Sequence, residues 1–164
     1  MVDYPKIAVK LATAITIALM NFAWISPAIA IERSFELNSD RGYRLETNFA
    51  YKRVEDSPIS ERGKGKTQAI DFLQVRFYAP DGKMIASYDN IVDGIARGEY
   101  FEINYDPKTQ KLSGNLDLGG ESAGEIYLKG NMSEGLSLIE VEPTGEEKVI
   151  SSGSWSLKNG DRSN

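Results

Sequence analysis

Residues 69–91 read AIDFLQVRFYAPDGKMIASYDNI and contain two apolar runs on either side of a turn. The first run, 69–78, is apolar at both odd and even positions, which predicts a strand at the centre of a sheet. Pro80 and Gly82 supply the fixed φ and the positive φ that a tight turn requires. We therefore predict that 84–91 returns as an antiparallel strand beside 69–78.

The same alternation of apolar and polar residues continues in both directions from this hairpin. Further strands are predicted over 31–37, 43–52, 99–105, 111–118, 124–130, 136–142 and 148–157. Gly114 falls on the apolar face of its segment, where a glycine often marks a bend. Residues 55–66 are polar and contain Pro58, Gly63 and Gly65, so we predict a loop there. No segment shows helical periodicity.

About nine sequential strands without helices to cover the sheet edges predict an all-β, antiparallel meander closed into a small barrel. A two-sheet β-sandwich fits the same pattern and stays open as the alternative. The length of 31–157 suits one hydrophobic core, so we assign this stretch to a single domain. Residues 158–164 are then a flexible polar tail.

Residues 1–30 have the composition of a signal peptide for export. Lys6 and Lys10 precede an apolar run over 11–25, and Ala28 and Ala30 are the small residues that signal peptidases require. Cleavage after Ala30 would place residues 31–164 in the periplasm or outside the cell, with no membrane span. The alternative is an uncleaved anchor, because roughly 20 apolar residues can cross a bilayer.

The composition excludes several kinds of site. The chain has 24 acidic and 19 basic residues, a net charge of −5, no histidine and no cysteine. An acidic chain repels the phosphates of nucleic acids, so we predict no nucleic-acid partner. Zinc, copper and haem iron are held mainly by histidine and cysteine, so we predict no such metal and no cofactor. A disulfide and a serine–histidine catalytic pair are excluded as well.

Two short motifs imitate ligand sites. Residues 63–67, GKGKT, lack the earlier glycine of a phosphate loop, because Ser60 stands there, and they lead into a strand instead of a helix. Asp89, Asn90 and Asp93 lack the spacing and the closing glutamate of a calcium loop. Turn chemistry accounts for both. Asn131 begins a formal glycosylation sequence, whose use the sequence leaves open.

Paired carboxylates can act as acid and base in an enzyme without histidine. Glu99 and Glu102 lie close to Asp106, but in a strand over 99–105 the two glutamates would point to opposite faces. This disfavours the pair as a catalytic site. A barrel enzyme, either an isomerase or a hydrolase that uses Asp, Glu or Tyr as acid–base groups, is therefore the alternative function.

Large aromatic residues occur on most of the predicted strands. If several converge inside a barrel, they can line a cavity for a small hydrophobic or amphipathic ligand. Phe72, Tyr88, Phe101 and Trp155 are the candidate ligand-binding residues. We therefore predict an exported, monomeric, non-catalytic binding protein whose partner is a small apolar ligand or an envelope protein. A structural or interaction role in the envelope is a further alternative.

Overall fold

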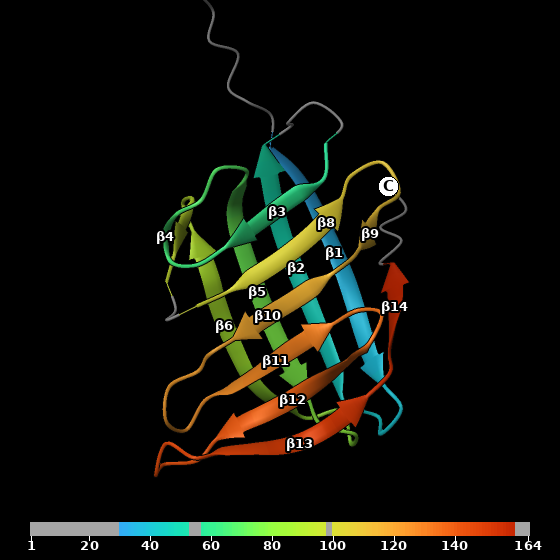
Figure 1. The fold of residues 1–164 in the computed structure, drawn as a ribbon, viewed down its shortest axis with the longest axis vertical. Coiled ribbons are helices and arrows are strands. Elements are labelled where there is room, and N and C mark those ends of the chain that lie inside the picture. The colour runs from blue at the N-terminus through green and yellow to red at the C-terminus, as the bar shows by residue number, and fades with distance from the viewer. Residues whose placement is uncertain (1–29, 53–56, 98–99, 160–164) are drawn as a thin grey trace, which may run out of the picture.

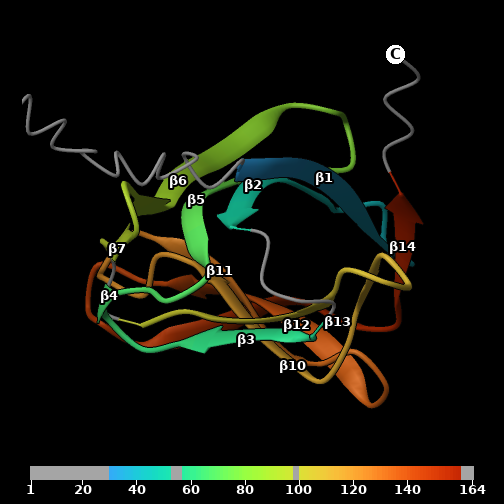
Figure 2. The same cartoon turned by 90° about the horizontal axis from the view of Figure 1, so that it is seen from above.

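The computed structural model of the chain describes residues 30–52, 57–97 and 100–159, and these residues form fourteen strands without any helix. The strands pair in an antiparallel manner and build two sheets, one stacked on the other (Figures 1 and 2). Among the described residues, no helix has the length and apolar character that a membrane span requires. The all-β prediction is confirmed.

The first sheet has the order β14-β1-β2-β5-β6-β7-β4. Its strands are β1 (Ala30–Ser39), β2 (Arg44–Lys52), β4 (Gly65–Lys66), β5 (Ile70–Tyr78), β6 (Met84–Val92), β7 (Ile95–Ala96) and β14 (Trp155–Asn159). The predicted hairpin is present, with Val75 of β5 opposite Tyr88 of β6. As expected, β5 is central, because β2 pairs with its other side.

The second sheet has the order β13-β12-β11-β10-β8-β3, and β9 also pairs with β8. Its strands are β3 (Ile59–Arg62), β8 (Glu102–Asp106), β9 (Lys111–Leu112), β10 (Asn115–Gly119), β11 (Ile126–Asn131), β12 (Gly135–Val141) and β13 (Glu147–Gly153). Gly114, with φ of +64°, separates β9 from β10. The bend predicted at this glycine is confirmed.

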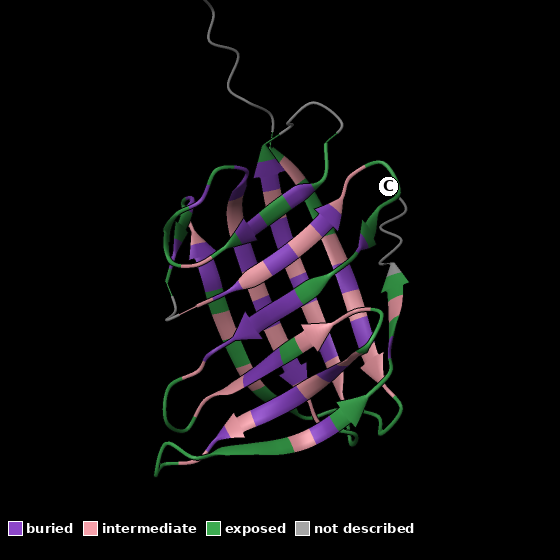
Figure 3. Cartoon of the chain, viewed as in Figure 1, coloured by how far each residue is buried: buried purple, intermediate pink, exposed green. Residues whose placement is uncertain are grey.

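The hydrophobic core lies between the two sheets (Figure 3). In β2, and in β5 from Leu73 to Phe77, every second residue is buried, as the two-residue period predicts. The innermost side chains, fully excluded from solvent, include Leu37, Leu45, Leu73, Val75, Phe77, Ile91, Ile103, Leu118 and Leu128. Because the chain has no cysteine, stability depends on this packing.

Polar side chains also join the two sheets. The bonds run from Asn90 Nδ2 to Gly119 O (2.6 Å), from Gly119 N to Asn90 Oδ1 (3.1 Å), from Ile126 N to Tyr88 Oη (2.8 Å) and from Trp155 Nε1 to Leu136 O (3.2 Å). Glu61 of β3 likewise accepts backbone bonds from Gln68 and Ala69, which precede β5. A buried donor or acceptor that loses its partner costs about 1–3 kcal/mol, so these bonds fix how the sheets stack.

The pairing fits the sandwich alternative, since the described strands form two separate sheets and do not close into a barrel. The chain passes between the sheets at both sides. On one side Gly63 and Lys64 connect β3 to β4, and on the other Ser154 connects β13 to β14. The edge strands are thus joined by the chain and not by a hydrogen-bonded ladder.

Three predicted boundaries are wrong. Residues 148–157 form two strands in different sheets, because Gly153 adopts a φ of +139° where the chain turns from one sheet to the other. The predicted loop 55–66 contains β3 and β4, and Ile59 and Glu61 of β3 are buried in alternation. Lys158 belongs to β14 instead of a tail. The predicted signal peptide up to residue 29, Glu99 and residues 160–164 lie outside the described residues.

Candidate functional site

None of the four candidate aromatic residues lines either of the two cavities described below. Phe101 (2% exposed) and Trp155 (8% exposed) are buried in the core, and Tyr88 packs against it. Phe72 is half-buried on the face of β5 opposite to buried Leu73. The hydroxyl of Tyr88 and the indole N–H of Trp155 are both used in bonds between the sheets. These polar groups therefore support the fold.

A small cavity reaches the core beside Phe35, Phe49 and Tyr105, and its volume is about 30 Å³. This volume suffices for about one or two water molecules. Pockets for small organic ligands start at about 300 Å³. None of the four candidate aromatic residues lines the cavity.

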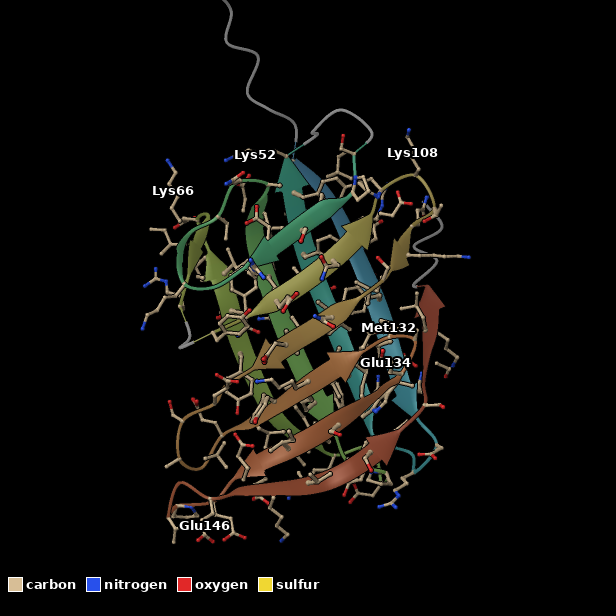
Figure 4. The ribbon with its side chains drawn as sticks, viewed as in Figure 1. Lys52, Lys66, Lys108, Met132, Glu134 and Glu146 are labelled. Carbon is tan, nitrogen blue, oxygen red and sulfur yellow. The ribbon has the colours of Figure 1, made fainter. Side chains whose placement is uncertain are left out.

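A wider groove, of about 620 Å³, lies on the outer face of the second sheet. We call it the outer groove, and it is lined by Tyr100, Glu102, Asn115, Leu116, Asp117, Glu121, Lys129, Gly130, Asn131 and Glu134. These residues come from β8, β10, β11 and the adjoining turns. Figure 4 looks onto this face of the sheet, with Glu134 beside the turn from β11 to β12. Most of the lining residues carry a polar group, and the groove has the volume of a ligand site.

Strand register places four charged residues in one row across the outer face of the second sheet. Arg62 of β3 is opposite Glu102 of β8, Glu102 is opposite Asp117 of β10, and Asp117 is opposite Lys129 of β11. Directly opposed residues of neighbouring strands share a face of the sheet and interact. The two carboxylates of the row therefore lie side by side between two cations.

Lys129 forms ion pairs with two of the carboxylates that line the outer groove. Its Nζ lies 3.2 Å from Asp117 Oδ2 and 3.6 Å from Glu121 Oε1. It also lies 5.7 Å from the centroid of the Tyr127 ring. Burial by itself would lower the pKa of Lys129, but Asp117 and Glu121 together raise it. Lys129 is therefore firmly protonated.

Asp117 is an unusual carboxylate, because its side chain is only 4% exposed. Apart from Lys129, whose Nζ is 3.2 Å away, no group among the described residues pairs with its Oδ2. Burial raises the pKa of Asp117 to about 6, against the opposing effect of Lys129 and with smaller upward contributions from Glu121 and Glu102. Ionised Asp117 is thus poorly stabilised in the folded protein, which is typical of functional sites.

The polar groups at either side of the charged row are held in place by their neighbours. Tyr100 Oη donates a long bond of 3.4 Å to Glu102 Oε2, and burial together with Glu102 raises the pKa of Tyr100. Asn131 Nδ2 donates to Asn115 Oδ1 (2.9 Å), which ties β11 to β10. The outer groove thus offers several acceptors, an ammonium group and one phenol.

No group of three or more acidic side chains in the described part of the chain is arranged to hold a metal ion. Of the carboxylates singled out from the sequence, Glu102 lines the outer groove, and Glu99 lies outside the described residues. Sequence reasoning missed Asp117 and Lys129. The signal was present, because Asp117 stands between Leu116 and Leu118 and so has to face away from the core.

No family model matches this sequence, and no curated protein or solved structure matches it either. The argument for function therefore rests on the residues of the outer groove.

The Asp117→Asn variant should become more stable relative to the wild type as the pH rises from about 4 to about 8. The pKa of Asp117 is about 6 in the folded protein and about 3.9 in an unfolded chain. The folded state therefore binds the proton more tightly, and the wild type loses stability as the pH rises through this window. Asparagine does not titrate and removes the loss.

Urea unfolding of both proteins at the two pH values measures the difference. Glu146→Gln is the control, because it removes the same charge from an exposed turn residue. A stability difference between Asp117→Asn and the wild type that stays constant with pH would contradict the raised pKa of Asp117.

Proposed function

We propose that the protein is an exported, non-catalytic binding protein whose ligand occupies the outer groove of the second sheet. The observation that carries this proposal is Asp117, a buried carboxylate at the wall of a groove of ligand size, whose ion-pair partner Lys129 is half-exposed. A group that is kept ionisable at a cost in stability is more readily explained by binding than by folding. Export is supported by the pattern of residues 1–30.

The interior is less suited to a ligand than the outer groove. Phe101 and Trp155 pack within the core, and the polar groups of Tyr88 and Trp155 already have backbone partners. The ligand that fits the outer groove is polar, in contrast to the apolar ligand that the aromatic residues favour.

Native mass spectrometry of the protein isolated from its exported compartment tests the proposal. We expect a small-molecule adduct in the native spectrum, and a denatured mass that begins at Ile31. Lys129→Trp should abolish the adduct, because a rigid indole ring in place of the lysine side chain obstructs the outer groove beside Asp117. Val149→Trp adds the same ring to an exposed position of β13 in the same sheet and should leave the adduct in place.

Two results would count against this proposal. An adduct that persists in Lys129→Trp would place the ligand elsewhere. A wild-type protein without any adduct would favour a role that needs no small ligand.

An acid–base enzyme that uses the same groove is the second candidate function. The observation in its favour is the pKa of Asp117, about 6, close to neutral pH, where a general acid or base works best. Incubating the recovered ligand with wild type and with Asp117→Asn distinguishes the candidates. Chemical conversion by the wild type alone would favour the enzyme, and an unchanged ligand favours binding.

A further inference from the structure

The surroundings of Lys129 show which chemical group the outer groove can hold. Its ammonium group has Asp117 Oδ2 at 3.2 Å, Glu121 Oε1 at 3.6 Å and the Tyr127 ring centroid at 5.7 Å. Carboxylates and an aromatic ring face are the partners that stabilise a bound ammonium ion. The side chain of Lys129 therefore occupies a site with the chemistry of an ammonium receptor.

The outer groove has more negative than positive charge. Its lining includes the carboxylates of Glu102, Asp117, Glu121 and Glu134, but only one cation, Lys129. Arg62, next in the row beyond Glu102, does not line the groove. Like charges that lie side by side repel, so a second cation in the groove would lower the electrostatic free energy.

The environment of Asp117 is a second indication of a ligand. The Asp117 side chain is 96% buried and lines the outer groove. The one partner that the described residues offer to its Oδ2 is Lys129 Nζ, 3.2 Å away, and the Lys129 side chain is itself 53% exposed. A buried carboxylate is costly without a charged donor, so a ligand donor that approaches through the groove can take the place of Lys129.

Lys129 itself can leave its position. Its side chain is 53% exposed, and a long lysine chain can move its ammonium group into solvent while its stem stays on the sheet. A primary ammonium group has three donors, so an incoming ligand can satisfy Asp117 and a neighbouring carboxylate together.

We infer that the outer groove binds a ligand with an organic ammonium group, and that Lys129 competes with this ligand for Asp117 and Glu121. This inference rests on the proposed function, in which the outer groove is the ligand site, and it adds the chemical class of the ligand. Lys129 acts as an internal substitute that keeps the carboxylates paired until the ligand arrives.

Calorimetric titration with cadaverine, a five-carbon diamine, tests the inference at low salt and about pH 8, where Asp117 is ionised. The neutral five-carbon diol of the same length is the matched ligand control. We expect the diamine to bind and the diol not to bind. Lys129→Thr should tighten diamine binding roughly tenfold, because the competitor is removed, and Asp117→Asn should weaken it roughly tenfold or more.

Two control variants separate this effect from the net charge of the protein. Lys148→Thr removes a lysine from an exposed position of β13, outside the groove. Glu146→Gln removes a carboxylate from the turn between β12 and β13, which lies away from Glu134 in Figure 4. Both should change diamine binding less than about twofold. Circular dichroism of every variant verifies that the fold is retained.

The outcomes distinguish this inference from the proposed function. If the diol binds as well as the diamine, the groove recognises hydroxyl groups, as for a saccharide, and only the ammonium inference is overturned. If neither probe binds but the native adduct is lost in Lys129→Trp, the inference also fails while the proposed function stands. Equal effects of Asp117→Asn and Glu146→Gln would overturn the inference, because attraction by net charge would then explain the binding.

Discussion

Gly119→Ala should destabilise the protein by more than about 3 kcal/mol, the largest effect that we expect from adding a single methyl group. Gly119 has a φ of +123°, and a Cβ atom there would lie 2.4 Å from Ile126 O and 2.8 Å from Tyr127 Cα. Both are backbone atoms of β11, the strand paired with β10. They cannot move away without breaking the pairing of β11 with β12.

Gly124→Ala is the matched control for the loss at Gly119. Gly124 also has a positive φ, of +86°, but an added Cβ would meet no atom within 4 Å. Gly124→Ala should lower the free energy of unfolding by only about 1 kcal/mol, because the new side chain has to adopt a left-handed backbone conformation. Urea unfolding measures both variants, and losses of equal size would show that the contact with β11 is unimportant.

Asn90→Leu should cost about 2–4 kcal/mol, the second largest loss. The Asn90 amide donates to Gly119 O and accepts from Gly119 N, and so joins β6 of the first sheet to β10 of the second. Leucine has a similar size but no polar group, so both backbone groups of Gly119 would lose their side-chain partner in a buried place. Thermal and urea unfolding measure the loss.

Asn90→Asp provides a more specific test of the same pair of bonds. A protonated aspartic acid can donate to Gly119 O and accept from Gly119 N as asparagine does, but a carboxylate can only accept. Burial therefore favours the protonated form and raises the folded-state pKa of the new group. Its stability should be closest to wild type at about pH 4 and should fall as the pH rises through that pKa. A loss that is independent of pH would exclude these bonds as the cause.

The parts of the fold that were predicted correctly depend on neighbours in the chain. The hairpin over 69–91 is an example, because Gly82 adopts a φ of +83° and Ala79 N donates to Lys83 O across the turn. The position of β3 depends on distant residues instead. Ile59 pairs with Tyr105, and nothing in a short polar segment indicates that partner. The choice of a sandwich over a barrel is also non-local, since it depends on which edge strands pair.

The outer groove could be predicted only in part. The sequence places Asp117 on the outer face of its strand and, once 111–118 and 124–130 are paired as a hairpin, close to Lys129. It does not show that Asp117 is buried, because burial depends on residues that folding brings beside it from other parts of the chain. The contacts of the aromatic residues could not be predicted for a related reason. Their size predicts burial, but the backbone partners of Tyr88 and Trp155 lie on strands of the other sheet.

The pairing of β1 with β14 has a consequence for how the chain can acquire its structure. Phe35 and Leu37 of β1 lie opposite Asn159 and Leu157 of β14, so the earliest described strand remains an open edge until the last one is present. Contacts between residues so far apart in the sequence form late and slow the folding of the chain. The first sheet is therefore complete only after the last described strand has been synthesised.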